Sequence, residues 1–189
     1  LVRPSIDASW IHGRDGFGDH GFPMPSIRAG EGYAAAQLAR IAKESKEPVT
    51  ILALGPLTNI AMAILLDPDF ENHVKEVLFM GGTFKVSGNQ SPRASYNVML
   101  DPEAAKVVYH SRIPVVQLGL DVCDKVTQRE SDLEEIKKAG TKAAEFLGIL
   151  LSSRLNQVTK PVYDKQGNKV GELKLEDQGG RHKGEIGLN

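Results

Sequence analysis

The segment from Val49 to Ala105 constrains the fold more than any other part of the chain. It reads VTILALGPLTNIA, then VLFMGG, then SGNQSPRASYNVMLDPEAA. A continuous apolar run such as Val49 to Leu54 is typical of a strand buried on both faces of a parallel sheet. Gly55-Pro56 then opens a helix, because proline is tolerated in the first helical turn. This alternation of strand and helix predicts an α/β fold.

The rest of the chain extends this alternation. We expect two more strands, at Val77 to Met80 and Pro114 to Leu120. We expect helices at Gly32 to Ser45, at Leu57 to Leu66, from Asp101 onward, and at Ser131 to Leu155, where Gly140 is expected to break the last one in two. The order implies right-handed crossovers in an open, mostly parallel, Rossmann-like sheet, and we expect helices on both of its faces. Ser131 with Glu134 fits a capping box for the last helix.

The two ends of the sequence differ from this core. Leu1 to Ala29 is rich in Gly and Pro and predicts a loop. Near the other end, PVYDKQGNKVGELKL alternates around Gln166-Gly167-Asn168, which predicts a C-terminal β-hairpin. We treat residues 1–189 as one partial domain, in which the hairpin and loop at residues 160–183 form a lid over the pocket.

Composition excludes some functions. With 23 Lys+Arg against 24 Asp+Glu, there is no basic excess to favour nucleic acid. No apolar run approaches the roughly 20 residues that span a membrane. The single cysteine, Cys123, cannot form an internal disulfide and is expected to be a small buried residue, which fits a reducing, cytoplasmic location.

Polar groups follow the predicted strands at the edge where open α/β sheets bind ligands. The carbonyl of Leu54 is predicted to be unpaired and able to bind a hard cation, or else to carry a water at an ordinary strand end. Asn89, Ser95, Tyr96 and Asn97 form a neutral cluster that can bind sugar hydroxyls, or else a turn rich in its usual residues. The chain has neither GxxxxGK[ST] nor GxGxxG, so neither nucleotide-binding fingerprint applies.

These motifs resemble, in their order, the inosine–uridine-preferring nucleoside hydrolase family. The resemblance rests on VTILALGPLTNIA, FMGG, GN, SPRASYNVMLDPEAAKVV and a strand ending GLDV, and on RPSIDASWIHGRDGFGD, which is similar to the family's HGxDG loop. It covers Leu1 to Thr127 well and is poorer from Gln128 onward. It implies hydrolysis of ribonucleosides to ribose and base, with Ca²⁺ held by a DxDxxxDD motif, a backbone carbonyl and a late Asp.

The resemblance also assigns roles to single residues. Leu54 matches the carbonyl ligand of the metal. Asn89 and Asn97 match residues that bind ribose, Met80 matches a residue near the sugar, and His12 matches one near the base. Tyr96 lies where the family usually has an aromatic or apolar residue, and Ser95 lies where a Glu commonly bonds ribose. The implied partner is a small-molecule ribonucleoside, without nucleic acid or membrane, and we allow a homo-oligomer such as a dimer or tetramer. Purine against pyrimidine preference stays open.

Three departures limit what the chain is expected to do. It contains no DxDxxxDD, it lacks the late metal Asp, and Ser95 replaces the Glu. Ca²⁺ takes about 6–8 oxygen ligands, so one carbonyl is too few. We therefore expect no catalytic general base, no Ca²⁺ binding and no hydrolysis by these 189 residues alone, and an active hydrolase for the longer parent of which we expect this chain to be a fragment.

Two other interpretations stay open. One is a non-catalytic relative that binds a nucleoside or ribose. The missing aspartates and Ser95 support this interpretation. An intact DxDxxxDD in the upstream coding sequence would favour the enzyme, and its replacement by apolar or amide residues would favour the binder. The other is a structural or interaction module, which predicts a long exposed apolar stripe that the sequence does not show.

Overall fold

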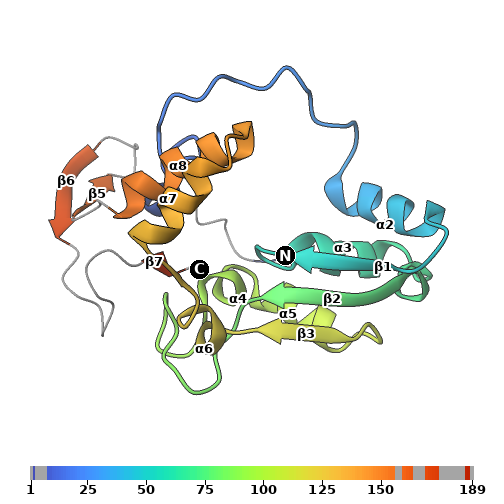
Figure 1. Cartoon of the computed structure of the whole chain (residues 1–189). Helices are drawn as coiled ribbons and strands as arrows, with labels where there is room; N and C mark the ends of the chain where they lie inside the picture. Colours follow the sequence, from blue (N-terminus) through green and yellow to red (C-terminus); the bar gives the residue numbers. More distant parts are fainter. Residues whose placement is uncertain (1, 3–7, 156–158, 164–168, 175–185, 188–189) are drawn as a thin grey trace. The chain divides into compact units, whose positions relative to one another are not determined.

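The computed structural model describes residues 2, 8–155, 159–163, 169–174 and 186–187 (Figure 1). These residues divide into two compact units. Unit 1 contains residues 27–124, and unit 2 contains residues 8–26 and the described residues from 125 to 187. No helix among the described residues is long and apolar enough to cross a membrane.

Unit 1 is built on a parallel sheet of three strands. These are β1 (Val49–Ala53), β2 (Val74–Met80) and β3 (Val115–Leu118), in the order β1-β2-β3. Leu52 pairs with Leu78, and Leu78 pairs with Val116, so one register runs across the sheet. The α/β class with a parallel sheet, predicted from the apolar runs, is confirmed.

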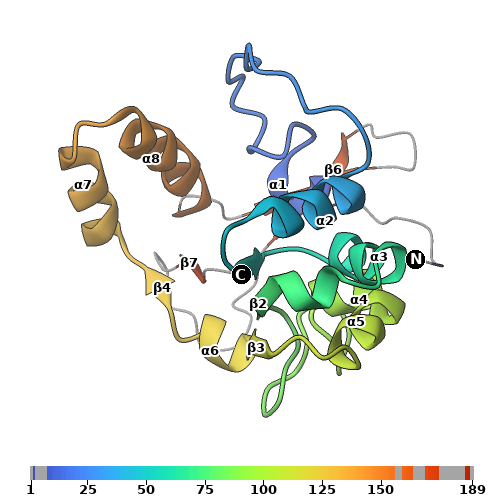
Figure 2. The ribbon, with the colours of Figure 1, turned by 90° about the vertical axis from the view of Figure 1, so that its right-hand side faces the viewer.

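The helices that follow β1 and β2 lie on the same face of this sheet. α3 (Thr58–Leu66) packs against α5 (Pro102–Tyr109), and α2 (Ala34–Glu44) packs against α3. Figures 1 and 2 show α3 and α5 together on one side of the three strands. Because each strand lies beside the next one in sequence, right-handed crossovers place both helices on one face instead of one on each face.

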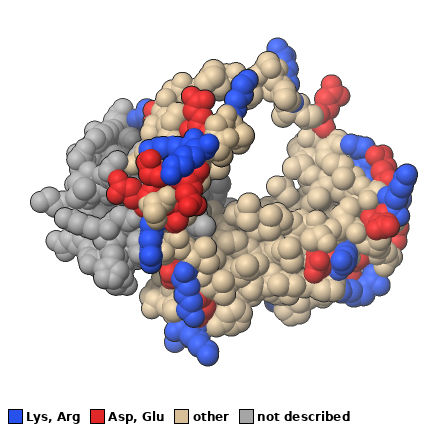
Figure 3. Space-filling model, in the orientation of Figure 1, with Lys and Arg blue, Asp and Glu red and all other residues tan. Residues whose placement is uncertain are grey.

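The core of unit 1 fills the space between this face and the helices. Phe79, Val77 and Val108 are fully buried, and Ile60 is 5% exposed. Each such side chain contributes about 1.5–3 kcal/mol when it leaves water. On the opposite face Leu52 stays 62% exposed, and Val116 and Leu118 are also partly open to solvent. Figure 3 shows this face largely uncharged, with charged side chains gathered over α2 and the amino ends of the strands.

A buried carboxylate joins the starts of the two helices. Asp101 is 3% exposed and is the N-cap of α5, where Oδ1 accepts a hydrogen bond of 3.0 Å from the backbone N–H of Ala104. Its Oδ2 accepts a hydrogen bond of 2.6 Å from Oγ1 of Thr58, in the first turn of α3. The Asp-Pro helix start predicted from the sequence is therefore confirmed, and it also aligns two helices at the carboxyl edge of the sheet.

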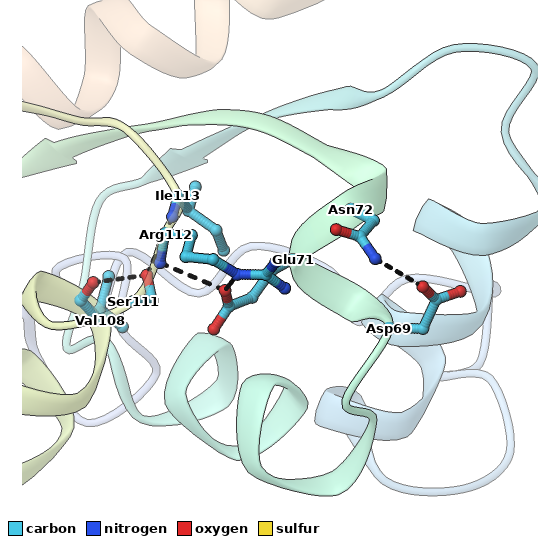
Figure 4. A network of polar contacts seen from close by, with 7 residues as sticks. All are labelled: Asp69, Glu71, Asn72, Val108, Ser111, Arg112 and Ile113. Atoms are coloured by element: carbon cyan, nitrogen blue, oxygen red, sulfur yellow. Dashed lines mark hydrogen bonds and ion pairs between the residues drawn. The ribbon is translucent and has the colours of Figure 1, made fainter.

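At the amino edge of the sheet a network of polar contacts surrounds the start of β2 and the turn before β3 (Figure 4). The 3₁₀ helix η1 (Phe70–His73) precedes β2, and Oε2 of its Glu71 accepts hydrogen bonds from Nε (2.8 Å) and the backbone N–H (3.2 Å) of Arg112. Beside it, Nδ2 of Asn72 donates to Oδ1 of Asp69 over 2.7 Å. These contacts fix the turn between α5 and β3 beside the start of β2.

Unit 2 combines helices with short strands. Its elements are α1 (Ser9–His12), β4 (Thr127–Gln128), α7 (Glu130–Lys138), α8 (Lys142–Leu155), β5 (Thr159–Tyr163), β6 (Lys169–Lys174) and β7 (Ile186–Gly187). Gly140 has φ 62° between α7 and α8, so the predicted break is confirmed. The predicted capping box is wrong, because Oδ2 of Asp132, not Glu134, accepts a hydrogen bond from the backbone N–H of Arg129 over 2.8 Å.

The hairpin expected near Gln166 is confirmed by the antiparallel pairing of β5 with β6. Its turn, with Gln166 itself, lies outside the described residues, as does the stretch 175–183 that was expected to form part of a lid. In unit 1, Cys123 ends the short helix α6 (Leu120–Cys123) and is 8% exposed, as expected for a small buried residue.

Candidate functional site

The double glycine after β2 is the backbone framework of the site. Gly82 has φ 77°, a conformation that side chains rarely adopt, and a Cβ there would collide with the amide of Gln117. That amide instead donates from Nε2 to the carbonyl of Gly81 over 2.9 Å, and its Oε1 accepts from the hydroxyl of Tyr109 over 2.7 Å. The turn is therefore held by β3 and α5 in the position where β2 ends.

Asn97 joins the carboxyl ends of two strands. It lies in α4 (Tyr96–Leu100), and its Nδ2 donates to the carbonyl of Leu54 over 3.1 Å and to the carbonyl of Met80 over 2.9 Å. Turning the amide over would place Oδ1 against two carbonyl oxygens, so the orientation is fixed by chemistry. Both amide hydrogens are used, and among the described residues Oδ1 has no hydrogen-bond donor.

Asn89 is also oriented by the backbone, but through its amide oxygen, whereas Asn97 is held through its NH₂ group. Its Oδ1 accepts a hydrogen bond of 2.8 Å from the backbone N–H of Tyr96, the first residue of α4. Its Nδ2 has no acceptor among the described residues. The two amides therefore present complementary groups, an acceptor on Asn97 and a donor on Asn89.

Ser95 has a partner within the protein. It is 2% exposed, and its Oγ accepts a hydrogen bond of 2.6 Å from the backbone N–H of Gly82. This contact ties the start of α4 to the end of β2. It gives a physical reason for a short hydroxyl side chain here, because the N–H of Gly82 would otherwise be buried without a partner.

Asp121 is a residue of this edge that was not predicted from the sequence. It lies on α6, directly after β3, and its two carboxylate oxygens accept from the backbone N–H groups of Phe84 (2.7 Å) and Lys85 (2.6 Å). These N–H groups hold the pKa of the Asp121 carboxyl below its ordinary value, because they stabilise the ionised form. The signal in the sequence was the Asp of GLDV, which directly follows the third strand at the ligand edge.

The carbonyl of Leu54 is not unpaired, so that expectation is wrong. It accepts from Asn97, although a carbonyl has a second lone pair that can serve a cation. Within the part of the chain that the structure describes, no group of three or more His, Cys, Asp or Glu side chains is arranged to hold a metal. The described residues therefore do not fit a Ca²⁺ site by themselves, since Ca²⁺ takes about 6–8 oxygens.

His12 is the one predicted site residue that lies in unit 2, where it ends α1. The loop after it is shaped by two carboxylates. Oδ1 of Asp19 accepts from the backbone N–H of Arg14 over 2.8 Å, and Oδ1 of Asp15 accepts from the backbone N–H of Phe17 over 2.7 Å. The other predicted residues, Leu54, Met80, Asn89, Ser95, Tyr96 and Asn97, are brought together at one edge of unit 1.

Comparison with known proteins identifies the family to which this edge belongs. The sequence profile of the inosine-uridine preferring nucleoside hydrolases matches residues 1–177. The chain belongs to this nucleoside hydrolase family. Among its curated members, the pyrimidine-specific ribonucleoside hydrolase RihA of Salmonella enteritidis is 36% identical over 151 residues, which are 80% of this chain and 48% of that protein.

Solved structures of nucleoside hydrolases share the fold. A plant nucleoside hydrolase matches with a TM-score of 0.71 and 31% identity, over 77% of this chain and 46% of that one. The purine-preferring ribonucleoside hydrolase from Gardnerella vaginalis matches with a TM-score of 0.74 and 26% identity, over 80% and 49%. The chain thus spans about half the length of the nucleoside hydrolases that it matches.

Proposed function

We propose that this chain supplies the sugar-binding half of an enzyme that hydrolyses ribonucleosides to ribose and a free base. Membership of the nucleoside hydrolase family gives the reaction class. The observation that carries the proposal is the orientation of Asn97, whose two amide hydrogens are held by the carbonyls of Leu54 and Met80. Its Oδ1 then accepts a hydrogen bond from a ribose hydroxyl.

The pair of amides suits a neutral polyol. A sugar hydroxyl both donates and accepts, so it can donate to Oδ1 of Asn97 and accept from Nδ2 of Asn89. Because the backbone fixes both amides, little side-chain entropy is lost when ribose binds. The proposed substrate class is therefore a small-molecule ribonucleoside recognised through its sugar.

The same groups favour the transition state of the reaction. Cleavage of a glycosidic bond passes through an oxocarbenium-like state, in which positive charge develops on the sugar ring. The Oδ1 of Asn97 is a partial negative charge, held in place at this strand edge by the carbonyls of Leu54 and Met80. Such fixed dipoles stabilise developing positive charge without having to reorganise.

Calcium is part of the proposal for the family but not for these 189 residues alone. The resemblance implies that the metal binds carboxylates together with the carbonyl matched by Leu54, and the described residues supply that carbonyl only. We expect titration calorimetry to show no Ca²⁺ binding by the 189-residue chain at millimolar metal. Tight binding would contradict this expectation, and so would release of ribose by the chain alone.

The base preference is not assigned. The matched relatives are named as pyrimidine-specific in one case and purine-preferring in another. Uridine and inosine are therefore both required as test substrates.

A binding protein without catalysis is the second candidate, and Ser95 favours it, since its short neutral side chain accepts from the N–H of Gly82 where the family commonly has a Glu that bonds ribose. The two functions are separated with protein expressed from the complete reading frame. Release of reducing sugar from uridine or inosine supports the hydrolase. Calorimetric binding of ribose without release of sugar supports the binder, and the absence of both contradicts both candidates.

A further inference from the structure

The loop between β2 and α4 is tied at its ends and at its tip. At its ends, the backbone N–H of Gly82 donates to Oγ of Ser95 over 2.6 Å. At its tip, the backbone N–H of Ser91 donates to the carbonyl of Ala94 over 3.4 Å, and a Cβ on Gly88 would collide with both backbone carbonyls of that turn. We call residues 83–94 the sugar loop, because it carries Asn89.

One flank of the sugar loop is held from outside it. Asp121 lies 36 and 37 residues away in sequence, and it binds the backbone N–H groups of Lys85 and Phe84 with one oxygen each. Gly119 lies two residues before Asp121. It is packed so that a Cβ there would contact the Asp121 carboxylate and Phe84. The adjoining backbone is joined as well, since the N–H of Leu120 donates to the carbonyl of Gly82 over 3.0 Å.

We propose that Asp121 is a positioning residue for substrate binding, which acts through the sugar loop and sets the place of Asn89. This inference rests on the proposed function. Asn89 contacts the rest of the site through the N–H of Tyr96, so its position depends on where the sugar loop is held. The side chain of Phe84 is 71% exposed and provides little packing, so the Asp121 carboxylate is an anchor that holds this flank from outside the loop.

The chemistry requires a carboxylate and not merely a side chain of this shape. A carboxylate has two acceptor oxygens, one for each N–H group. In Asp121→Asn the amide NH₂ would face one of these N–H groups, donor against donor. The substitution is nearly isosteric, so it releases half of the anchor while leaving the volume of the side chain unchanged.

The experiment uses Asp121→Asn in protein expressed from the complete reading frame, with Glu47→Gln as matched control. Glu47 is exposed and lies between α2 and β1, so the control makes the same change of acid to amide away from the loop. Hydrogen exchange of the peptide covering Phe84 and Lys85 is expected to become about tenfold faster or more in Asp121→Asn, because a charge-assisted hydrogen bond is lost. Exchange in α3 is expected to stay unchanged, which shows that the fold is intact.

The second measurement separates positioning from a merely structural role. With uridine or inosine, KM is expected to rise about fivefold to tenfold and kcat to stay within about twofold, because Asn89 contributes binding that is uniform in ground and transition states. Calorimetric affinity for ribose is expected to fall by the same factor. Glu47→Gln is expected to change none of these values.

The inference and the proposed function can fail separately. Unchanged exchange at Phe84 and Lys85 overturns the anchor, and faster exchange with unchanged KM and ribose affinity overturns the positioning role. If the unsubstituted protein hydrolyses no ribonucleoside, the proposed function fails, and ribose affinity still decides on Asp121. If it also binds no ribose, both are overturned.

Discussion

The two ends of the parallel sheet in unit 1 use polar side chains differently. At the amino ends, Glu71 binds Arg112, whose side chain is 72% exposed, and Asn72 binds Asp69 on the surface. At the carboxyl ends, Asn97 and Asp121 bind carbonyl and N–H groups of the backbone that leaves the strands. The first set joins side chains mainly to one another, and the second fixes the backbone of a binding edge.

This difference teaches how a neutral binding site is built. Exposed ion pairs contribute about 0–1 kcal/mol, because water screens them and long side chains lose entropy. A side chain that binds two backbone groups is oriented by them, and its remaining polar atom is then ready for a ligand. We therefore expect substitutions at the carboxyl edge to cost more than chemically matched substitutions at the amino edge.

The largest effect on stability is expected for Asn97→Asp. At neutral pH its carboxylate would face the carbonyl oxygens of Leu54 and Met80 in place of two N–H donors. The free energy of unfolding, measured in urea, is expected to fall by about 2 kcal/mol, roughly 1 for each hydrogen bond. The matched control Asn72→Asp is expected to cost about 0.5 kcal/mol. Equal losses in the two variants would erase the contrast between the edges.

A smaller loss is expected for Ser95→Ala, because the buried N–H of Gly82 then has no partner. We expect about 1–2 kcal/mol in the free energy of unfolding. Ser111→Ala is the control at the amino edge, where Oγ of the part-buried serine donates to the carbonyl of Val108 and accepts a longer bond of 3.3 Å from the backbone N–H of Ile113. About 0.5 kcal/mol is expected. A larger loss for Ser111→Ala would reverse the comparison.

Glu71→Gln tests the amino edge directly. The ion pair with Arg112 is lost, but the amide oxygen can still accept from the backbone N–H of Arg112. Less than about 1 kcal/mol is expected, discounted for the exposed arginine. Urea unfolding in low and high salt checks this, because the difference from the unsubstituted protein should shrink as salt screens the pair. A loss above about 2 kcal/mol in the free energy of unfolding would show that the ion pair stabilises the amino edge strongly, against this account.

The pH dependence is the smallest effect. The pKa of Asp121 is lower in the folded chain than in the unfolded chain, where it is about 3.9. Its ionised form therefore adds stability that is present above about pH 3.9 and is lost as the pH falls through the lower folded pKa. The backbone amide proton shifts of Phe84 and Lys85 should titrate with a midpoint below 3.9. A midpoint at or above 3.9 would contradict the anchoring hydrogen bonds.

The sequence predicted most of the fold of unit 1 because each element is encoded locally. The apolar run from Val49, the Gly-Pro turn after it and the Asp101 helix start are short patterns, and each lies where it was predicted. The face on which a helix lies depends instead on strand order, which is a property of the whole sheet. That is why α3 and α5 share one face within unit 1, whereas one helix on each face was expected.

The site was predicted in its residues but not in its bonding. Asn89 and Asn97 follow from a polar cluster at a ligand edge, whereas the direction of each amide depends on carbonyl and N–H groups contributed by other strands and helices. Asp121 was missed for the same reason, since its partners lie 36 and 37 residues away in the chain. The partner of Ser95 is the backbone N–H of Gly82, thirteen residues earlier in the chain. This contact also depends on the conformation of the double glycine, which the local sequence pattern does not specify.

The most direct test is the kcat/KM for a ribonucleoside in Asn97→Ala, made in protein expressed from the complete reading frame, with Glu47→Gln as control. If the backbone-oriented amide of Asn97 reads the ribose hydroxyl in the transition state, kcat/KM falls by about a hundredfold or more, which corresponds to about 2.7 kcal/mol. The control should stay within about twofold. A value for Asn97→Ala within about threefold of the unsubstituted enzyme would contradict the account of this edge as the sugar-binding half of a nucleoside hydrolase.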